Sequence, residues 1–198
     1  MRGILGGTFD PPHVAHLVAA EAAYRQLALE TVTFVPAGAP WQKAEREVSP
    51  AEDRWAMTRL AVEGVGYFEA DDREVMRPGW TYTIDTLETF DEPVVLIVGA
   101  DAARGLPTWY RARDVMARAT IAVIPRPGVD ARSVERRLEG ATMLWLETPL
   151  LAISGTMLRD RVRRGHSVRF LVPDPVWRYV EEHGLYRVDD GRLEDRSA

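Results

Sequence analysis

Two histidines and two adjacent glycines mark a candidate anion-binding loop near the start of the chain. The segment reads Gly6-Gly7-Thr8-Phe9-Asp10-Pro11-Pro12-His13-Val14-Ala15-His16. Adjacent glycines let the backbone approach a ligand closely, and a helix that begins near His13 would add free N–H groups and a partial positive charge. His13 and His16 are three residues apart, so they share a face of that helix. The pattern predicts a phosphate-binding loop in which both imidazoles donate hydrogen bonds, more strongly when they are protonated.

Two other interpretations of the histidine pair are open. Half of a zinc site would need a third ligand from His166, His183 or a carboxylate, and no spacing suggests one. Surface or core positions are the usual fate of a lone histidine, but here a strand end, paired glycines and a helix start coincide. The segment lacks the Gly-Lys-Ser/Thr of the Walker loop and the spaced glycines of the dinucleotide fingerprint.

A second candidate phosphate wall lies late in the chain, in Ile153-Ser154-Gly155-Thr156-Met157-Leu158-Arg159. Ser154 suits the N-cap of a helix that carries Arg159 one turn further on. The hydroxyls of Ser154 and Thr156 and the guanidinium fork of Arg159 are typical ligands of phosphate oxygens.

Further candidate ligands follow other expected strands. Gly99 permits a close approach, and the Asp101 carboxylate can accept hydrogen bonds from ribose hydroxyls. Arg126 follows a later strand, where it either approaches the adenine or faces solvent. Lys43 lies in a Pro/Gly-rich loop, where a lone lysine is often merely solvated.

The elements that must position these groups alternate along the chain. Apolar runs predict strands at residues 3–5, 31–35, 67–70, 94–98, 120–124 and 143–146, and amphipathic patterns predict helices at residues 13–27, 50–62, 83–90, 110–118 and 131–138. Ser49-Pro50-Ala51-Glu52 matches a capping box with proline at the first helical position. Asp174-Pro175 opens a last helix that Gly184 ends. This alternation predicts a doubly wound, mostly parallel α/β sheet, whose ligands bind at the carboxyl ends of the strands.

Size and composition predict one domain over residues 1–186, followed by a mobile tail over residues 187–198. The chain has no cysteine, which excludes disulfides and thiolate metal sites, and its net charge of −5 argues against a protein that coats nucleic acid. It has no apolar run of eighteen residues and no signal peptide, so we expect a cytoplasmic protein without a membrane span. The oligomeric state stays open, with a homo-oligomer as one option.

The opening segment closely resembles the Gly-Gly-Thr-Phe-Asp-Pro-x-His-x-Gly-His motif of the bacterial nicotinate-mononucleotide adenylyltransferase family, within the nucleotidyltransferase superfamily that has the His-x-Gly-His element. The one mismatch is Ala15, where the family usually has glycine, and its methyl group could tighten the adenine side of the loop. The late segment resembles the family's Ile-Ser-Ser-Thr-x-(Ile/Leu)-Arg, with Gly155 in place of the second serine. The likeness extends in order through about residue 186.

The resemblance implies a Rossmann-like nucleotidyltransferase fold that joins ATP and nicotinate mononucleotide into deamido-NAD and pyrophosphate. It implies that His13, His16, Lys43 and Arg159 are the catalytic residues. The implied ATP-binding residues are Gly6, Gly7, Thr8, Phe9, His13, His16, Gly99, Asp101, Arg126, Ser154, Thr156 and Arg159. The implied acceptor-binding residues are Lys43, Tyr82, Thr83, Trp109 and Tyr110, with Trp109 stacked on the pyridine ring. Thr83 also suits a helix N-cap. We expect Mg²⁺ to arrive on the ATP phosphates.

Three alternatives remain. The nearest is an adenylyl- or cytidylyltransferase for another acceptor, such as nicotinamide mononucleotide or phosphopantetheine. An aminoacyl-tRNA synthetase is disfavoured, because the chain lacks a Lys-Met-Ser-Lys-Ser loop and a tRNA-binding appendage. A non-catalytic nucleotide-binding module would more readily have lost His13, His16 or Arg159, which are all present.

Overall fold

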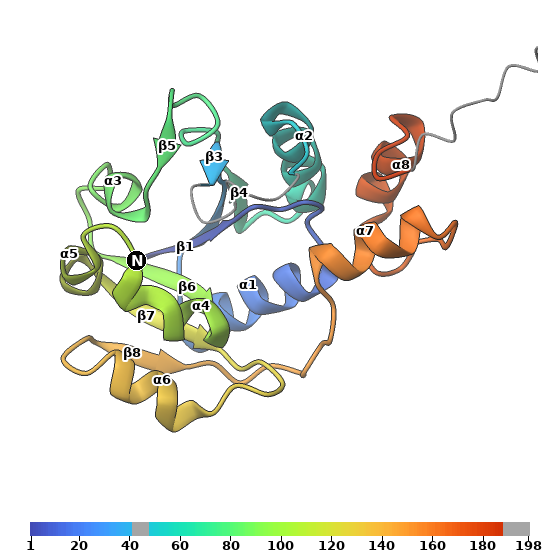
Figure 1. Cartoon of the computed structure of the whole chain (residues 1–198). Coiled ribbons are helices and arrows are strands. Elements are labelled where there is room, and N and C mark those ends of the chain that lie inside the picture. The colour runs from blue at the N-terminus through green and yellow to red at the C-terminus, as the bar shows by residue number, and fades with distance from the viewer. Residues whose placement is uncertain (41–47, 188–198) are drawn as a thin grey trace, which may run out of the picture.

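Six parallel strands form the central sheet of the computed structural model, which describes residues 1–40 and 48–187 (Figure 1). Their order across the sheet is β4-β2-β1-β6-β7-β8, and every neighbouring pair is parallel. The strands are β1 (Arg2–Gly7), β2 (Thr31–Pro36), β4 (Phe68–Ala70), β6 (Val94–Gly99), β7 (Ala119–Ile124) and β8 (Met143–Trp145). The chain therefore reverses its direction of winding between β1 and β6, and ligands of such sheets bind at that reversal.

Side chains on the central strands alternate between two apolar clusters. In β6, Val94, Leu96 and Val98 belong to one cluster, whereas Val95 and Ile97 belong to the other. A strand that is buried on both faces reads as a continuous apolar run, which is why the sequence identified these strands well.

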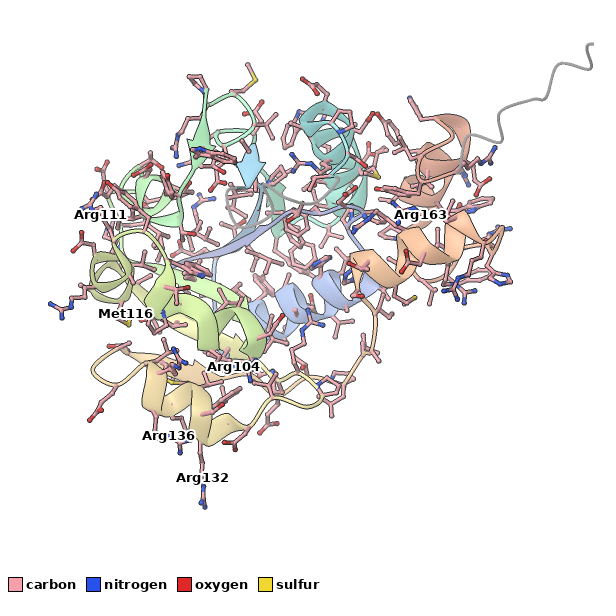
Figure 2. The ribbon with its side chains drawn as sticks, viewed as in Figure 1. Arg104, Arg111, Met116, Arg132, Arg136 and Arg163 are labelled. Carbon is pink, nitrogen blue, oxygen red and sulfur yellow. The ribbon has the colours of Figure 1, made fainter. Side chains whose placement is uncertain are left out.

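Helices cover both faces of the sheet (Figure 1). Alanines of α1 pack in the cluster of one face, together with the end of α2, and the cluster of the other face takes side chains from α3 to α6. Figure 2 shows Arg132 and Arg136 pointing outward from α6, whereas Val134 of the same helix is buried. The helices are α1 (Val14–Gln26), α2 (Ala51–Val62), α3 (Thr83–Leu87), α4 (Ala100–Gly105), the 3-10 helix η2 (Leu106–Thr108), α5 (Ala112–Arg118), α6 (Ala131–Arg137), α7 (Gly155–Arg163) and α8 (Asp174–Glu182).

A third apolar cluster joins α2, α7 and α8 beside the sheet (Figure 1). Met57 of α2, Leu158 of α7 and Val176 of α8 are fully buried in it. The cluster fixes α7, and with it Arg159, relative to α2 and α8.

The structure confirms all six predicted strands and the doubly wound parallel sheet. It adds a small parallel pair, β3 (Ala39–Pro40) with β5 (Trp80–Thr81), and the unpredicted helices α4 and η2. The predicted helix 83–90 ends earlier, at Leu87.

The predicted capping box before α2 is wrong. Pro50 itself is the N-cap residue and no side chain caps the helix. Ser49 is engaged elsewhere, since its backbone N–H donates to the Asp10 carboxylate over 3.2 Å.

Two predicted features lie wholly or partly outside the described residues. Lys43 falls in residues 41–47, and the predicted tail falls there from residue 188 onward. Arg187, the first residue of that tail, is anchored, because its guanidinium pairs with Glu181 over 2.6 Å. Within the part of the chain that the structure describes, no helix has the length and apolar character needed to cross a membrane.

Candidate active site

A cavity of about 700 Å³ opens at the carboxyl ends of β1, β2, β6 and β7. The residues predicted from the sequence that line it are Gly6, Gly7, Thr8, His16, Tyr82, Thr83, Gly99, Asp101, Trp109, Tyr110 and Arg126. The cavity thus lies where the winding direction reverses, with the phosphate loop at one end and an aromatic group at the other.

His16 of the phosphate loop lines this cavity, and a hydrogen bond from the backbone fixes which of its ring nitrogens carries the proton. The N–H of His13, the N-cap of α1, donates to the Nδ1 atom of His16 over 3.1 Å. An imidazole nitrogen that accepts a bond carries no proton, so the neutral ring of His16 has its proton on Nε2. His16 lines the cavity, so this Nε2–H is the group of the ring that can donate to a phosphate oxygen.

His13 lies deeper and has a different electrostatic character. It is only 2% exposed, and its ring stacks on that of His16 with centroids 3.7 Å apart. Burial, helped by the positive charge of Arg126, lowers the pKa of His13 to about 4. His13 is therefore neutral at neutral pH in this structure, so its surroundings disfavour the protonated form that would donate more strongly to phosphate.

Phe9 supports the loop from behind. Its side chain is 2% exposed within the apolar cluster under α1, and it does not line the cavity. Its ring meets His16 edge-on, with centroids 5.0 Å apart. The side chain of Phe9 thus orients His16, whereas the sequence placed Phe9 among the ATP ligands.

The late segment flanks the phosphate loop from α7. Ser154 is the N-cap of α7, as predicted, and its hydroxyl accepts from the N–H of Met157 over 3.2 Å. One Nη atom of Arg159 donates to the Asp10 carbonyl over 2.7 Å, and the other lies 3.4 Å from the Thr156 hydroxyl. Ser154, Thr156 and Arg159 are not part of the cavity lining, so they stand at the outer edge of the loop.

Gly155 stands where the family motif has its second serine, and the structure gives a steric reason for the glycine. A Cβ atom at Gly155 would lie 2.8 Å from the carbonyl oxygen of Asp10. The close approach of α7 to the phosphate loop therefore requires glycine in this chain.

The aromatic end of the cavity is formed by α3 and the segment after η2. Tyr82 and Tyr110 pack together, with ring centroids 4.5 Å apart, and Trp109 is half-buried next to them. Tyr82 is the N-cap of α3 and Thr83 its first residue, so Thr83 is not the N-cap itself.

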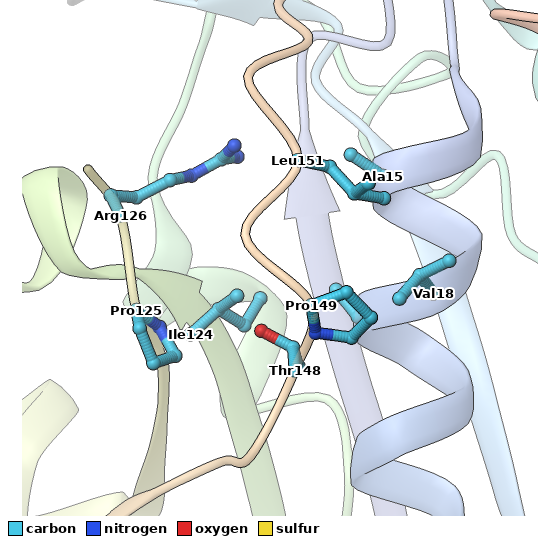
Figure 3. Close-up of a pocket in the computed structure, with 9 residues that line it drawn as sticks. Ala15, Val18, Ile124, Pro125, Arg126, Thr148, Pro149 and Leu151 are labelled. Atoms are coloured by element: carbon cyan, nitrogen blue, oxygen red, sulfur yellow. The ribbon is translucent and has the colours of Figure 1, made fainter.

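A narrow crevice joins the main cavity near the start of α1 (Figure 3). Ala15 and Arg126 line both spaces. Figure 3 shows the Arg126 side chain extending toward the segment that carries Leu151. Arg126 therefore faces the site, and the methyl group of Ala15 narrows the space beside it.

The sequence interpretation missed Arg54, which holds the loops of the site together. The side chain is 1% exposed and donates to the carbonyls of Thr8 (3.1 Å), Gly38 (2.7 Å) and Ala37. The spacing in the sequence could have indicated a buried arginine, because Arg54 is three residues before Met57 and lies on the same buried face of α2.

Glu74 was missed as well. Its buried carboxylate lines the cavity and accepts from the Thr86 hydroxyl over 2.5 Å. Burial raises the pKa of Glu74 above its ordinary range. A glutamate in a charged loop reads as solvated, so no sequence pattern distinguished it.

No group of three or more His, Asp or Glu side chains that could hold a metal ion occurs among residues 1–40 and 48–187. The predicted site residues that are described supply mainly N–H groups, imidazoles and guanidinium groups, which suit phosphate oxygens.

Known proteins resemble this chain over nearly its whole length. A family model described as Cytidylyltransferase-like matches residues 4–161. A protein of Acidothermus cellulolyticus, named a probable nicotinate-nucleotide adenylyltransferase, is 42% identical, with 96% of this chain and 95% of that protein covered. A protein of the same name from Saccharopolyspora erythraea is also 42% identical, with coverage of 95% and 90%.

A solved structure shares the fold. The Plasmodium falciparum nicotinic acid mononucleotide adenylyltransferase complexed with NaAD superposes with a TM-score of 0.79 at 16% identity, covering 93% of this chain and 96% of that one.

Proposed function

Because the chain belongs to the nicotinate-nucleotide adenylyltransferase family, we propose that it transfers the adenylyl group of ATP to nicotinate mononucleotide. The products are deamido-NAD and pyrophosphate. The transfer serves the biosynthesis of NAD.

One observation carries the proposal: a single cavity of about 700 Å³ connects the phosphate loop with the aromatic end at Tyr82 and Trp109. The reaction needs a triphosphate and a pyridine mononucleotide side by side, and a cavity of this volume is within the range of nucleotide-sized ligand sites. ATP occupies the end with Gly6, Gly7 and His16, and the acceptor occupies the aromatic end.

The chemistry is a direct in-line displacement at the α-phosphorus. The second pKa of a phosphate monoester is about 6, so the acceptor phosphate is already a nucleophile at neutral pH. No covalent enzyme intermediate is needed, and catalysis consists of alignment and neutralisation of charge on the leaving pyrophosphate.

The residues have separate roles in this displacement. His16 donates from Nε2 to a phosphate oxygen, and neutral His13 fixes the His16 ring through its backbone N–H. Arg159, at the outer edge of the loop, neutralises the β- and γ-phosphates together with Ser154 and Thr156. Lys43 supplies a further positive charge to the triphosphate or the acceptor phosphate.

Magnesium enters as part of the nucleotide. Mg²⁺ prefers phosphate oxygens and water, and the donors of the loop suit the phosphate rather than a cation. It would neutralise charge on the triphosphate while the residues of the chain hold the phosphate groups in place.

The aromatic end of the cavity suits the pyridine ring of the acceptor and the carboxylate that this ring carries. Trp109 stacks on the pyridine, and the Thr83 region binds the carboxylate with its hydroxyl and backbone. We further propose that residues 1–186 act as one domain, and that the enzyme works in the cytoplasm, independently of nucleic acid.

Pyrophosphate release tests the proposal. The protein is incubated with ATP, Mg²⁺ and either nicotinate mononucleotide or nicotinamide mononucleotide, with phosphopantetheine as a third acceptor. We expect turnover with the nicotinate compound above the others. No turnover with any acceptor would refute the transferase, and preference for the amide would correct the acceptor.

A further inference from the structure

Asp10, in the middle of the phosphate loop, joins three segments that are distant in sequence. Its side chain is almost wholly buried, with 3% of it exposed. Its carboxylate accepts from the N–H of Ser49 over 3.2 Å and from the hydroxyl of Tyr186 over 2.8 Å, and its carbonyl accepts from Arg159 over 2.7 Å. We call Asp10, Ser49, Arg159 and Tyr186 the Asp10 junction.

Tyr186 is a fixed donor in this junction. It follows α8 with φ of 66°, a left-handed conformation that a tyrosine seldom adopts. Burial and the neighbouring carboxylate of Asp10 raise the pKa of Tyr186, so its hydroxyl keeps its proton. The residue thus contributes its hydroxyl hydrogen bond to Asp10 at every physiological pH.

Arg159 of α7 contacts the same residue. Its Nη1 atom bonds the Asp10 carbonyl and lies 3.7 Å from the Asp10 carboxylate. One side of the guanidinium is therefore fixed on the phosphate loop. The position of Arg159 relative to the loop depends on the orientation of Asp10.

We propose that Asp10 and Tyr186 are positioning residues for the triphosphate of ATP, a role that rests on the proposed function. Tyr186 orients Asp10, and Asp10 holds the phosphate loop and Arg159 in one arrangement before the nucleotide binds. A site ordered in advance loses less conformational freedom on binding, so its affinity is higher. The junction thereby makes ATP affinity depend on a side chain beyond the last helix.

The chain offers a matched control. Tyr179 of α8 donates to the Asp53 carboxylate of α2 over 2.8 Å, the same kind of bond at the same length. That bond also joins α8 to another element, but it does not involve the phosphate loop. Tyr179→Phe therefore reports what the loss of such a bond does to stability alone.

The test compares Tyr186→Phe and Tyr179→Phe with the wild-type chain. Loss of a hydrogen bond to a charged group leaves that group without its partner, so we expect Tyr186→Phe to weaken ATP binding by about 10-fold, measured by calorimetry with Mg-ATP alone. We expect its KM for ATP to rise similarly and its KM for nicotinate mononucleotide to stay unchanged. Tyr179→Phe should lower the melting temperature without changing ATP binding. Equal ATP binding by Tyr186→Phe and the wild type would overturn the proposal.

A double-mutant cycle gives an independent measurement. If Tyr186 acts through Asp10, the effects of Tyr186→Phe and Asp10→Asn on ATP binding must be non-additive, whereas those of Tyr179→Phe and Asp10→Asn must add. Additive effects in both cycles would overturn the proposal. Should Tyr186→Phe fail to fold, Asp10→Asn alone decides, because unchanged ATP binding would refute the role of Asp10.

These measurements separate the two proposals. ATP binding needs no acceptor and no turnover. A wild-type chain that binds ATP but releases no pyrophosphate would refute the proposed function, while the binding data would still decide the role of the junction.

Discussion

His16 combines three constraints in one side chain. Its Nδ1 accepts from the backbone, one edge meets Phe9, and its face stacks on His13. A ring held on three sides loses no rotational freedom when it donates to a phosphate, and preorganised donors of this kind give large catalytic effects.

Replacing His16 should therefore remove catalysis and leave the fold. For His16→Ala we expect kcat to fall by about 10²–10³-fold, the size found when one preorganised donor is deleted. His166→Ala is the control, because His166 is exposed beyond the end of α7. Pyrophosphate release measures the rates and circular dichroism the fold. Activity within a few-fold of the wild type would contradict the role of His16.

His13 should make stability depend on pH. Between pH of about 4 and 6.5 the unfolded chain protonates this histidine and the folded chain does not, so the unfolded state binds more protons and stability falls as pH falls. From pH 7 to 5 we expect a loss of about 2 kcal/mol from this group, at 1.36 kcal/mol per pKa unit. Urea unfolding of the wild type and His13→Asn at both pH values measures it. The same pH dependence in both proteins would show that His13 is not the titrating group.

Site residues within a contiguous motif could be predicted from the sequence. Residues whose contacts are distant in the sequence could not. His16 and Arg126 line the cavity and Ser154 caps α7, and each follows a recognisable strand end or helix start. Arg54 and Glu74 were missed because they contact backbone and hydroxyl groups that are 5 to 46 residues away.

Among the elements, the small β3–β5 pair depends on one glycine. A Cβ atom at Gly38 would lie 2.0 Å from the backbone oxygen of Glu74. This packing brings the segment after β2 against the segment before α3, and so it joins residues 37–40 with the acceptor end of the cavity.

Gly38→Ala should consequently destabilise the protein. The obstacle is backbone, which cannot rotate away, so we expect a loss of about 2–3 kcal/mol, as for overpacked core sites. Gly66→Ala is the control, since a Cβ atom there meets nothing within 4 Å. Guanidinium unfolding of both variants gives the comparison. Equal free energies of unfolding for the Gly38→Ala and Gly66→Ala variants would mean that the β3–β5 pair shifts to accommodate the added methyl group.

Long elements were predictable and short ones were not. The strands buried on both faces stand out as apolar runs, and the predicted ends of these strands and of α1 and α2 agree within about two residues with the observed ones. The two-residue strands β3 and β5 carry too little pattern, and their pairing is decided by the contact between Gly38 and Glu74. Helix α4 starts directly after Gly99, where the sequence suggested only a ligand loop.

At the scale of the whole chain, the proposed function assigns the two substrates to different structural units. The ATP end involves the phosphate loop together with α7 and the residue after α8, which belong to the cluster around α2. The acceptor end involves α3 and η2, which pack on one face of the sheet.

Each substrate should accordingly protect its own unit from amide hydrogen exchange. We expect Mg-ATP alone to slow exchange in residues 6–16 and 154–160, and nicotinate mononucleotide alone to slow exchange in residues 80–87 and 106–110. Mass spectrometry of peptic fragments resolves these ranges, with α6 as an internal control that faces neither substrate. Protection of α7 by the acceptor alone would contradict this division.

The Asp10 junction also has a consequence for synthesis on the ribosome. Strand β1 can pair with β6 only after residue 99 has emerged, since Arg2 lies opposite Val94. The hydroxyl that completes the junction arrives later still, with Tyr186. All strands of the sheet, which end at Trp145, therefore leave the ribosome before this hydroxyl, and the proposed role of the junction predicts that a product ending short of residue 186 binds ATP more weakly.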